Sequence, residues 1–72
     1  MLIQTESGKT GRVAQEIAAL AGVDSAVVVT GPYDVIARIQ ADSIDTVGQM
    51  VLSRIQAVRG VTRTVTCPVV RI

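Results

Sequence analysis

One short segment occurs twice in this chain and constrains its fold more than any other feature. Residues 19–23 read ALAGV and residues 57–61 read AVRGV. Each segment follows apolar residues at helical spacing and leads into a β-branched run. A glycine at such a point lets a chain leave a helix in a left-handed conformation. The sequence therefore predicts two strand–helix–strand units.

A β-hairpin is predicted between the two units. Residues 26–29 and 35–39 are rich in aliphatic and β-branched side chains, and residues 30–34 between them read TGPYD. Gly31 can supply a positive φ, and Pro32 fixes its own φ near the value that a turn needs. Tyr33 is the only aromatic residue of the chain. Asp34 beside it either caps a backbone amide or is available to a ligand.

The helices are predicted from the spacing of apolar residues. After a first strand at residues 1–5, residues 12–21 predict a helix that Gly22 ends. A second helix is predicted to begin at an N-cap, Asp42 or Ser43, with Asp45 in its first turn, and to end at residues 59–60. The buried side chains of the first helix are predicted to be Val13, Ala14, Ile17, Ala18, Leu20 and Ala21, and those of the second Ile44, Val47, Val51, Ile55 and Val58.

Residues 61–67 predict a fourth strand with regular alternation. The two faces are predicted to carry Val61, Val65 and Cys67 on one side and Thr62, Thr64 and Thr66 on the other. Cys67 is expected to be a small buried side chain. Pro68 cannot donate a hydrogen bond to a neighbouring strand, so it is predicted to end the strand.

These elements give the order βαββαβ, that of an α+β, ferredoxin-like sandwich. Residues 1–72 are expected to form one domain, a four-stranded antiparallel sheet with two helices on one face. The other face has no cover within the chain. The mean hydropathy of +0.47 is high for 72 residues, because so small a domain buries only about 60% of its unfolded surface. The sequence therefore predicts a homodimer that packs through the sheets.

The composition limits the functions that this chain can have. The net charge is +1 with scattered Lys and Arg residues, so no basic surface for DNA is expected. With no histidine and one cysteine, few acid–base groups remain, and we predict no catalytic residue, metal or cofactor. The GKT sequence at residues 8–10 lacks the earlier glycine of a phosphate-binding loop. No membrane span or signal peptide is recognisable, which predicts a cytoplasmic protein.

The chain resembles the effector-binding and oligomerisation domain of the leucine-responsive (Lrp)/AsnC family of transcription regulators. The resemblance rests on Gly22 and Val23, on TGPYDV at residues 30–35 and on GVTRTVT at residues 60–66, and it spans nearly the whole chain. It implies dimers that assemble into octamer-like rings. It also implies that a small effector, usually an amino acid, binds between dimers near the hairpin turn.

Carried to this sequence, the resemblance implies a ligand site of five residues: Gly31, Tyr33, Asp34, Thr64 and Thr66. Turn amides would receive the carboxylate of an amino acid, and Asp34 would receive its ammonium group. The helix-turn-helix domain of full-length family members is not recognisable in residues 1–72. The resemblance therefore implies a stand-alone module that does not bind DNA directly. It would act on transcription through full-length Lrp/AsnC regulators, by mixed assembly or by competition for the effector.

Two other functions are compatible with this topology. An ACT-type amino-acid sensor would also bind a small effector, although the TGPYD turn argues against it. A small monooxygenase-like enzyme, built as a dimeric ferredoxin-like barrel, would need reactive groups on the uncovered sheet face. The polar candidates there are Arg38, Gln40 and the threonines. Turnover of simple quinols would distinguish such an enzyme from an effector module.

Overall fold

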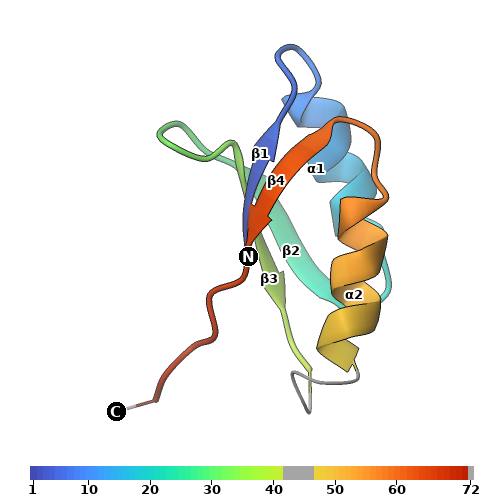
Figure 1. The fold of residues 1–72 in the computed structure, drawn as a ribbon, viewed down its shortest axis with the longest axis vertical. Coiled ribbons are helices and arrows are strands. Elements are labelled where there is room, and N and C mark those ends of the chain that lie inside the picture. The colour runs from blue at the N-terminus through green and yellow to red at the C-terminus, as the bar shows by residue number, and fades with distance from the viewer. Residues whose placement is uncertain (42–46, 72) are drawn as a thin grey trace.

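The computed structural model describes residues 1–41 and 47–71. Its strands form one antiparallel sheet in the order β2-β3-β1-β4, and the helices lie together on one side of it (Figure 1). The α+β, ferredoxin-like βαββαβ fold is therefore confirmed. In chain order the elements are β1 (Leu2–Thr5), α1 (Thr10–Ala18), β2 (Val23–Val28), β3 (Val35–Ile39), α2 (Val47–Gln56) and β4 (Val61–Val65).

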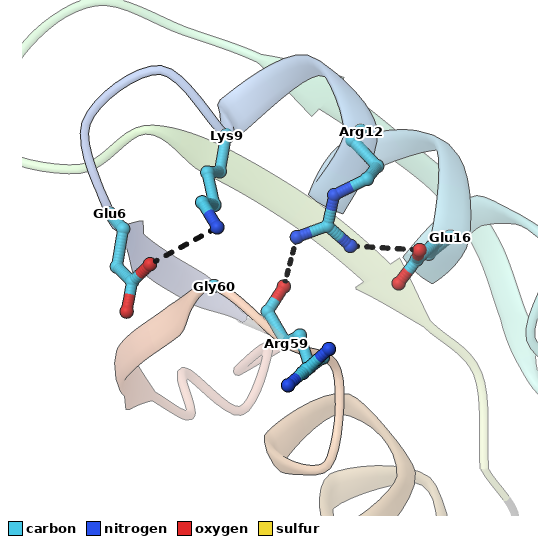
Figure 2. A pocket seen from close by; sticks show the side chains of 6 residues that line it. All are labelled: Glu6, Lys9, Arg12, Glu16, Arg59 and Gly60. Atoms are coloured by element: carbon cyan, nitrogen blue, oxygen red, sulfur yellow. Dashed lines mark hydrogen bonds and ion pairs between the residues drawn. The ribbon is translucent and has the colours of Figure 1, made fainter.

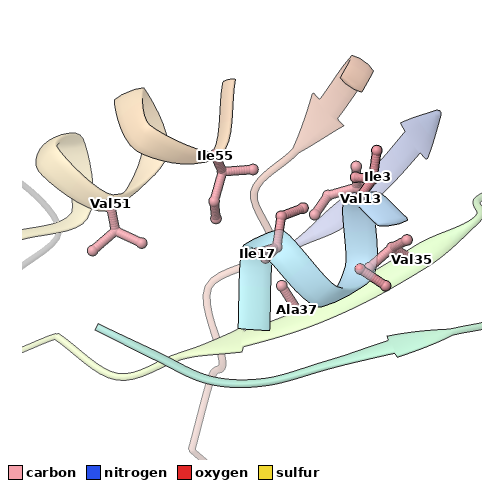
Figure 3. Close-up of a cluster of buried hydrophobic side chains, with 8 residues drawn as sticks. Ile3, Val13, Ile17, Val35, Ala37, Val51 and Ile55 are labelled. Carbon is pink, nitrogen blue, oxygen red and sulfur yellow. The ribbon is translucent and has the colours of Figure 1, made fainter. Parts of the chain in front are cut away.

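The hydrophobic core fills the space between the helices and the sheet (Figure 3). Its side chains come from both helices and from the central strands β1 and β3, which are covered on this face. The predicted helix stripe is only partly correct, because α1 ends at Ala18 and leaves Ala18 and Ala21 exposed. The buried apolar residues of the described chain are Ile3, Val13, Ala14, Ile17, Val35, Ala37, Val51 and Ile55.

The repeated segment forms the same turn after each helix. The N–H of Val23 donates to the carbonyl of Leu20, and the N–H of Val61 donates to that of Val58, each at 3.2 Å. The glycine inside each turn has a positive φ, +93° or +101°. The two predicted strand–helix–strand units are confirmed. Gly22 differs from the prediction in one respect, since it lies inside this turn, beyond the helix end, and does not itself terminate α1.

The second helix is confirmed where the structure describes it, but it ends at Gln56 and not at residues 59–60 as predicted. Val51 and Ile55 are buried, and Val58 packs partly buried against the core. The predicted N-cap, first-turn and first stripe residues lie outside the described part of the chain: Asp42, Ser43, Ile44 and Asp45. Neither α1 nor the described part of α2 is long and apolar enough to cross a membrane.

Strand β4 contradicts the predicted regular alternation. Gln4 pairs with Arg63, but the next residue, Thr5, pairs with Val61, so β4 carries one extra residue, Thr62. Such a bulge reverses the direction of the side chains that precede it. Val61 therefore packs against the core on the side opposite to Arg63.

The end of β4 also differs from the prediction. The strand ends at Val65, so Cys67 and Pro68 belong to the exposed tail that leaves the body of the domain (Figure 1). Cys67 was expected to be buried, and it is exposed. The reason is that no helix or strand of the described chain covers this segment.

The sheet face opposite the helices carries a row of apolar side chains, one from each strand. The row follows the register of the ladders, with Leu2 paired to both Ile36 and Val65, and Ile36 paired to Val27. Val27 is 52% exposed and Ile36 40% exposed. We call these four residues the open-face row. It crosses all four strands as a continuous apolar band that no helix or strand of the described residues covers.

Candidate functional site

The hairpin turn between β2 and β3 is fastened to the end of β1. Gly31 has the predicted positive φ, +138°. The N–H of Val29 donates to the Asp34 carbonyl, and the N–H of Asp34 donates to the Ile3 carbonyl, both at 2.9 Å. The side-chain amide of Gln4 donates to the carbonyl of Pro32 at 3.0 Å. The turn is therefore held by its own strands and by a side chain of the neighbouring strand.

The Asp34 carboxylate continues the ladder between β3 and β1. Its Oδ2 accepts the backbone N–H of Thr5 at 2.8 Å and lies 3.4 Å from the Thr5 hydroxyl. That hydroxyl is 2.7 Å from the hydroxyl of Thr10, the first residue of α1. One oxygen of Asp34 thus caps a backbone amide, which is one of the two roles that the sequence left open. Among the described residues, no hydrogen bond involves the other oxygen, Oδ1.

The five predicted site residues do not converge within one chain. Gly31, Tyr33 and Asp34 lie together in the turn, with Tyr33 and Asp34 half-buried. Strand β1 separates them from β4. The hydroxyl of Thr64 lies on the helix side, 3.3 Å from the side-chain nitrogen of Gln56. Thr66 follows the end of β4, and the register places it further from the turn than Thr64.

Sequence reasoning missed the residues that hold the turn. Gln4 binds Pro32 and Thr5 binds Asp34 across long separations in the chain, and the Thr5 hydroxyl also contacts that of nearby Thr10. Only the β1–β3 register brings Gln4 and Thr5 to the turn, and periodicity does not specify a register. The short apolar pattern of residues 1–5 gave no signal for the contact between Thr5 and Asp34.

A second polar region lies where the turn after α2 meets the start of α1 (Figure 2). It is an open cleft of about 660 Å³ lined by Glu6, Lys9, Arg12, Glu16, Arg59 and Gly60. Arg12 Nη1 lies 2.8 Å from Glu16 Oε1, and Arg12 Nη2 donates to the Arg59 carbonyl at 2.7 Å. Lys9 and Glu6 are 3.8 Å apart. Because Arg12 is already bound to protein groups, we interpret the cleft as a structural contact between α1 and the turn after α2. We call the bonds that Arg12 makes there the Arg12 contact.

The hairpin turn therefore offers the better candidate site. It combines a carboxylate oxygen that no described residue binds with backbone amides and an aromatic side chain, and such a set can hold a small polar ligand. Within residues 1–41 and 47–71, no group of three His, Cys, Asp or Glu residues is placed to hold a metal ion.

Comparison with known proteins agrees with the fold and with a binding role. The family model described as the Lrp/AsnC ligand binding domain matches residues 1–72. The chain belongs to the Lrp/AsnC family. The resemblance drawn from the turn and the last strand is thus confirmed. A crystal structure of a hypothetical protein from Pyrococcus horikoshii has a TM-score of 0.75 to this domain, with 27% sequence identity over 86% of this chain and 75% of that chain.

Curated Lrp/AsnC relatives are described as uncharacterised helix-turn-helix-type transcriptional regulators. One from Pyrococcus abyssi and one from Pyrococcus horikoshii are each 36% identical over 62 residues, and one from Pyrococcus furiosus is 34% identical over the same length. Each match covers 85% of this chain and 41% of the relative. The chain therefore spans less than half the length of these regulators.

Proposed function

We propose that this domain binds a free amino acid or a similar small metabolite at the hairpin turn and regulates transcription through longer Lrp/AsnC regulators. The proposal assigns it no catalytic activity and no direct contact with DNA. The main support for the proposal is the bonding of the Asp34 carboxylate. Its Oδ2 accepts the Thr5 N–H, whereas its Oδ1 has no hydrogen bond among the described residues. An ammonium group can use Oδ1 without disturbing the ladder. Membership of a ligand-binding family supports this assignment.

The turn can provide the remaining contacts of the ligand. Outward amides near Gly31 suit a carboxylate, because a backbone with positive φ can present neighbouring N–H groups together. Half-buried Tyr33 can form one wall. Thr64 and Thr66 are distant from the turn of their own chain, so in this proposal they reach the ligand from a neighbouring copy.

Assembly forms the second part of the proposed function. The open-face row of Leu2, Val27, Ile36 and Val65 spans the whole sheet, and apolar bands of this kind are typical of interfaces. We infer that a second copy covers it by packing sheet on sheet, and that dimers then form octamer-like rings. Mixed assembly with longer relatives would connect ligand binding to regulators that carry a helix-turn-helix.

The ligand proposal is tested by the effect of the twenty L-amino acids on the melting temperature. A ligand that binds only the folded state raises it. Asp34→Asn keeps an acceptor for the Thr5 amide but removes the charge, so we expect normal folding and roughly 10- to 100-fold weaker binding. Asp34→Ala should lose binding and also about 1 kcal/mol of folding stability. Unchanged affinity in Asp34→Asn would contradict the role of the carboxylate.

The assembly proposal is tested by light scattering at micromolar concentration. We expect the wild type to be a dimer or larger. Ile36→Asp places a charge in the centre of the open-face row and should give a folded monomer, because an unpaired buried charge is costly. Met50→Asp is the matched control, since Met50 is 57% exposed on α2, and it should leave the assembly unchanged. A wild-type protein with the mass of one subunit would refute the proposal.

A further inference from the structure

We propose that the hydroxyl groups of Thr5 and Thr10 position the Asp34 carboxylate for the ammonium group of the ligand. This inference rests on the function proposed above and explains how the same site is kept in its binding geometry. Neither threonine was among the site residues predicted from the sequence. Both act through Asp34 and neither touches the ligand, so they are positioning residues.

The three side chains form a chain of contacts from the hairpin turn to the start of α1. Oδ2 of Asp34 accepts the Thr5 N–H at 2.8 Å and lies 3.4 Å from the Thr5 hydroxyl. The Thr5 hydroxyl lies 2.7 Å from that of Thr10. All three residues are half-buried, so water competes less with these contacts than it does at an exposed site. The chain connects the turn, the last residue of β1 and the first residue of α1.

The direction of the hydrogen bonds follows from the chemistry of the carboxylate. A carboxylate only accepts hydrogen bonds, whereas a hydroxyl has one proton to donate. When Thr10 donates to Thr5, the proton of Thr5 is free to point at Oδ2 of Asp34. The opposite direction would leave only lone pairs of Thr5 facing a negatively charged oxygen. We therefore assign Thr10 as the donor of the 2.7 Å bond, which makes the Thr5 hydroxyl a better donor to Asp34.

Two donors on the same oxygen fix the orientation of the carboxylate. The terminal torsion of an aspartate side chain is broad, so the Thr5 amide alone leaves the carboxylate some freedom to turn. The Thr5 hydroxyl, held by Thr10, adds a second donor on the side of Oδ2. Its 3.4 Å separation is long for such a bond, so its contribution is smaller than that of the amide. The result is that Oδ1, the oxygen proposed to receive the ammonium group, stays turned away from β1.

The start of α1 supports this role for Thr10. Threonine at an N-cap position usually accepts a hydrogen bond from a free amide of the first helical turn. In this domain the N-cap is Lys9, which makes no side-chain cap hydrogen bond within the described chain, and Thr10 follows it as the first helical residue. The recorded bond of the Thr10 hydroxyl goes to Thr5. Its contact therefore serves the strand and the turn and not the helix end.

The test uses Thr5→Val, which removes the hydroxyl but keeps the backbone amide and the branched shape of the side chain. Each protein is titrated, well below its melting temperature, with the L-amino acid that most raises the wild-type melting temperature. We expect Thr5→Val to bind roughly 3- to 10-fold more weakly and Thr10→Val about 3-fold more weakly. Thr5→Ser keeps the hydroxyl and should bind within about 2-fold of the wild type. Thr62→Val is the matched control, since Thr62 is exposed on β4, and it should bind as the wild type does.

A double variant shows whether the hydroxyl acts through the carboxylate. When Asp34 is already replaced in Asp34→Asn, adding Thr5→Val should weaken binding by less than about 2-fold. Losses that multiply in the double variant would mean that Thr5 acts independently of Asp34, and the inference would be wrong. Wild-type affinity in Thr5→Val would also refute it, although the proposed function would stand in both cases. If no amino acid raises the melting temperature of the wild type, both the proposed function and this inference are wrong.

Discussion

The two turns that follow the helices have the same backbone but different surroundings. A Cβ atom added at Gly22 would lie 2.8 Å from the side chain of Val51. A Cβ atom added at Gly60 would lie 2.9 Å from the side chain of Val13, and also close to Arg12 and Lys9. The glycine of each unit therefore packs against a buried valine on the helix of the other unit. This reciprocal contact locks the two halves of the domain together.

The difference between the turns shows which contacts are common to both strand–helix–strand units and which occur in one unit. The glycine and the valine occur in both units, so they belong to the shared backbone architecture. The hydrogen bond from Arg12 to the Arg59 carbonyl occurs only at the second turn. In α2 the residue directly before Val51 is Met50, which is 57% exposed and cannot donate such a bond. The Arg12 contact is thus a feature of the turn after α2 that the turn after α1 does not share.

The largest effect is expected from alanine at the two turn glycines. In both Gly22→Ala and Gly60→Ala, the side chain meets a positive φ and a buried valine closer than 3.0 Å. We expect each to lower the free energy of unfolding by about 2–4 kcal/mol, a large part of the total for so small a domain. Urea denaturation at one fixed protein concentration measures both.

Gly11→Ala is the matched control for the two turn variants. Gly11 lies inside α1, and among the described residues an added Cβ atom would meet no atom within 4 Å beyond its neighbours in the helix. Because alanine favours a helix over glycine, this variant should be as stable as the wild type or up to about 1 kcal/mol more stable. A large loss in one turn variant and none in the other would show that the two units do not contribute equally.

The fold could be predicted because its signals are local. Helical spacing, β-branched runs and the repeated glycine each lie within a few residues, and together they specify the order βαββαβ. The errors arose where a long-range contact decides the outcome. Thr62 forms a bulge because β4 pairs irregularly with β1, and Cys67 is exposed because β4 ends at Val65. Neither feature is written in the spacing of residues 61–67.

The candidate site could be predicted only in part for the same reason. The turn identified Gly31, Tyr33 and Asp34, since Gly, Pro and Asp mark a turn by themselves. The bond from Thr5 to Asp34 joins residues that are far apart in the chain, and the position of Thr64 away from the turn depends on the β1–β4 register. A register cannot be derived from one strand, because its pattern fits a neighbour equally well after a shift of two residues.

An intermediate effect on stability is expected when the Arg12 contact is removed. Arg12→Met makes α1 resemble α2, where Met50 stands before the buried valine. It removes the bond to the Arg59 carbonyl and the pair with Glu16. Because the Arg12 side chain is 43% exposed, water compensates for part of this loss. We expect a decrease of about 1 kcal/mol in the free energy of unfolding.

Met50→Ala provides the comparison for Arg12→Met in the other unit. Its exposed side chain makes none of the hydrogen bonds or ion pairs recorded among the described residues, and we expect a change within about 0.5 kcal/mol. A decrease in Met50→Ala as large as that in Arg12→Met would mean that the loss reflects the helix surface in general. The Arg12 contact would then make no specific contribution to the free energy of unfolding.

The smallest effect is expected from the two carboxylates that pair with the cations of the cleft. Glu16 lies 2.8 Å from Arg12 and orients the guanidinium that reaches the Arg59 carbonyl, whereas Glu6 lies 3.8 Å from Lys9. Both pairs are about half exposed, so Glu16→Gln should lower the free energy of unfolding by about 0.5 kcal/mol and Glu6→Gln by no more than about 0.2 kcal/mol. Repeating the denaturation at about 1 M salt should reduce the difference, because exposed ion pairs are screened. If Glu6→Gln is the more destabilising of the two, the main stabilising contact of the cleft is made by Lys9 and not by Arg12.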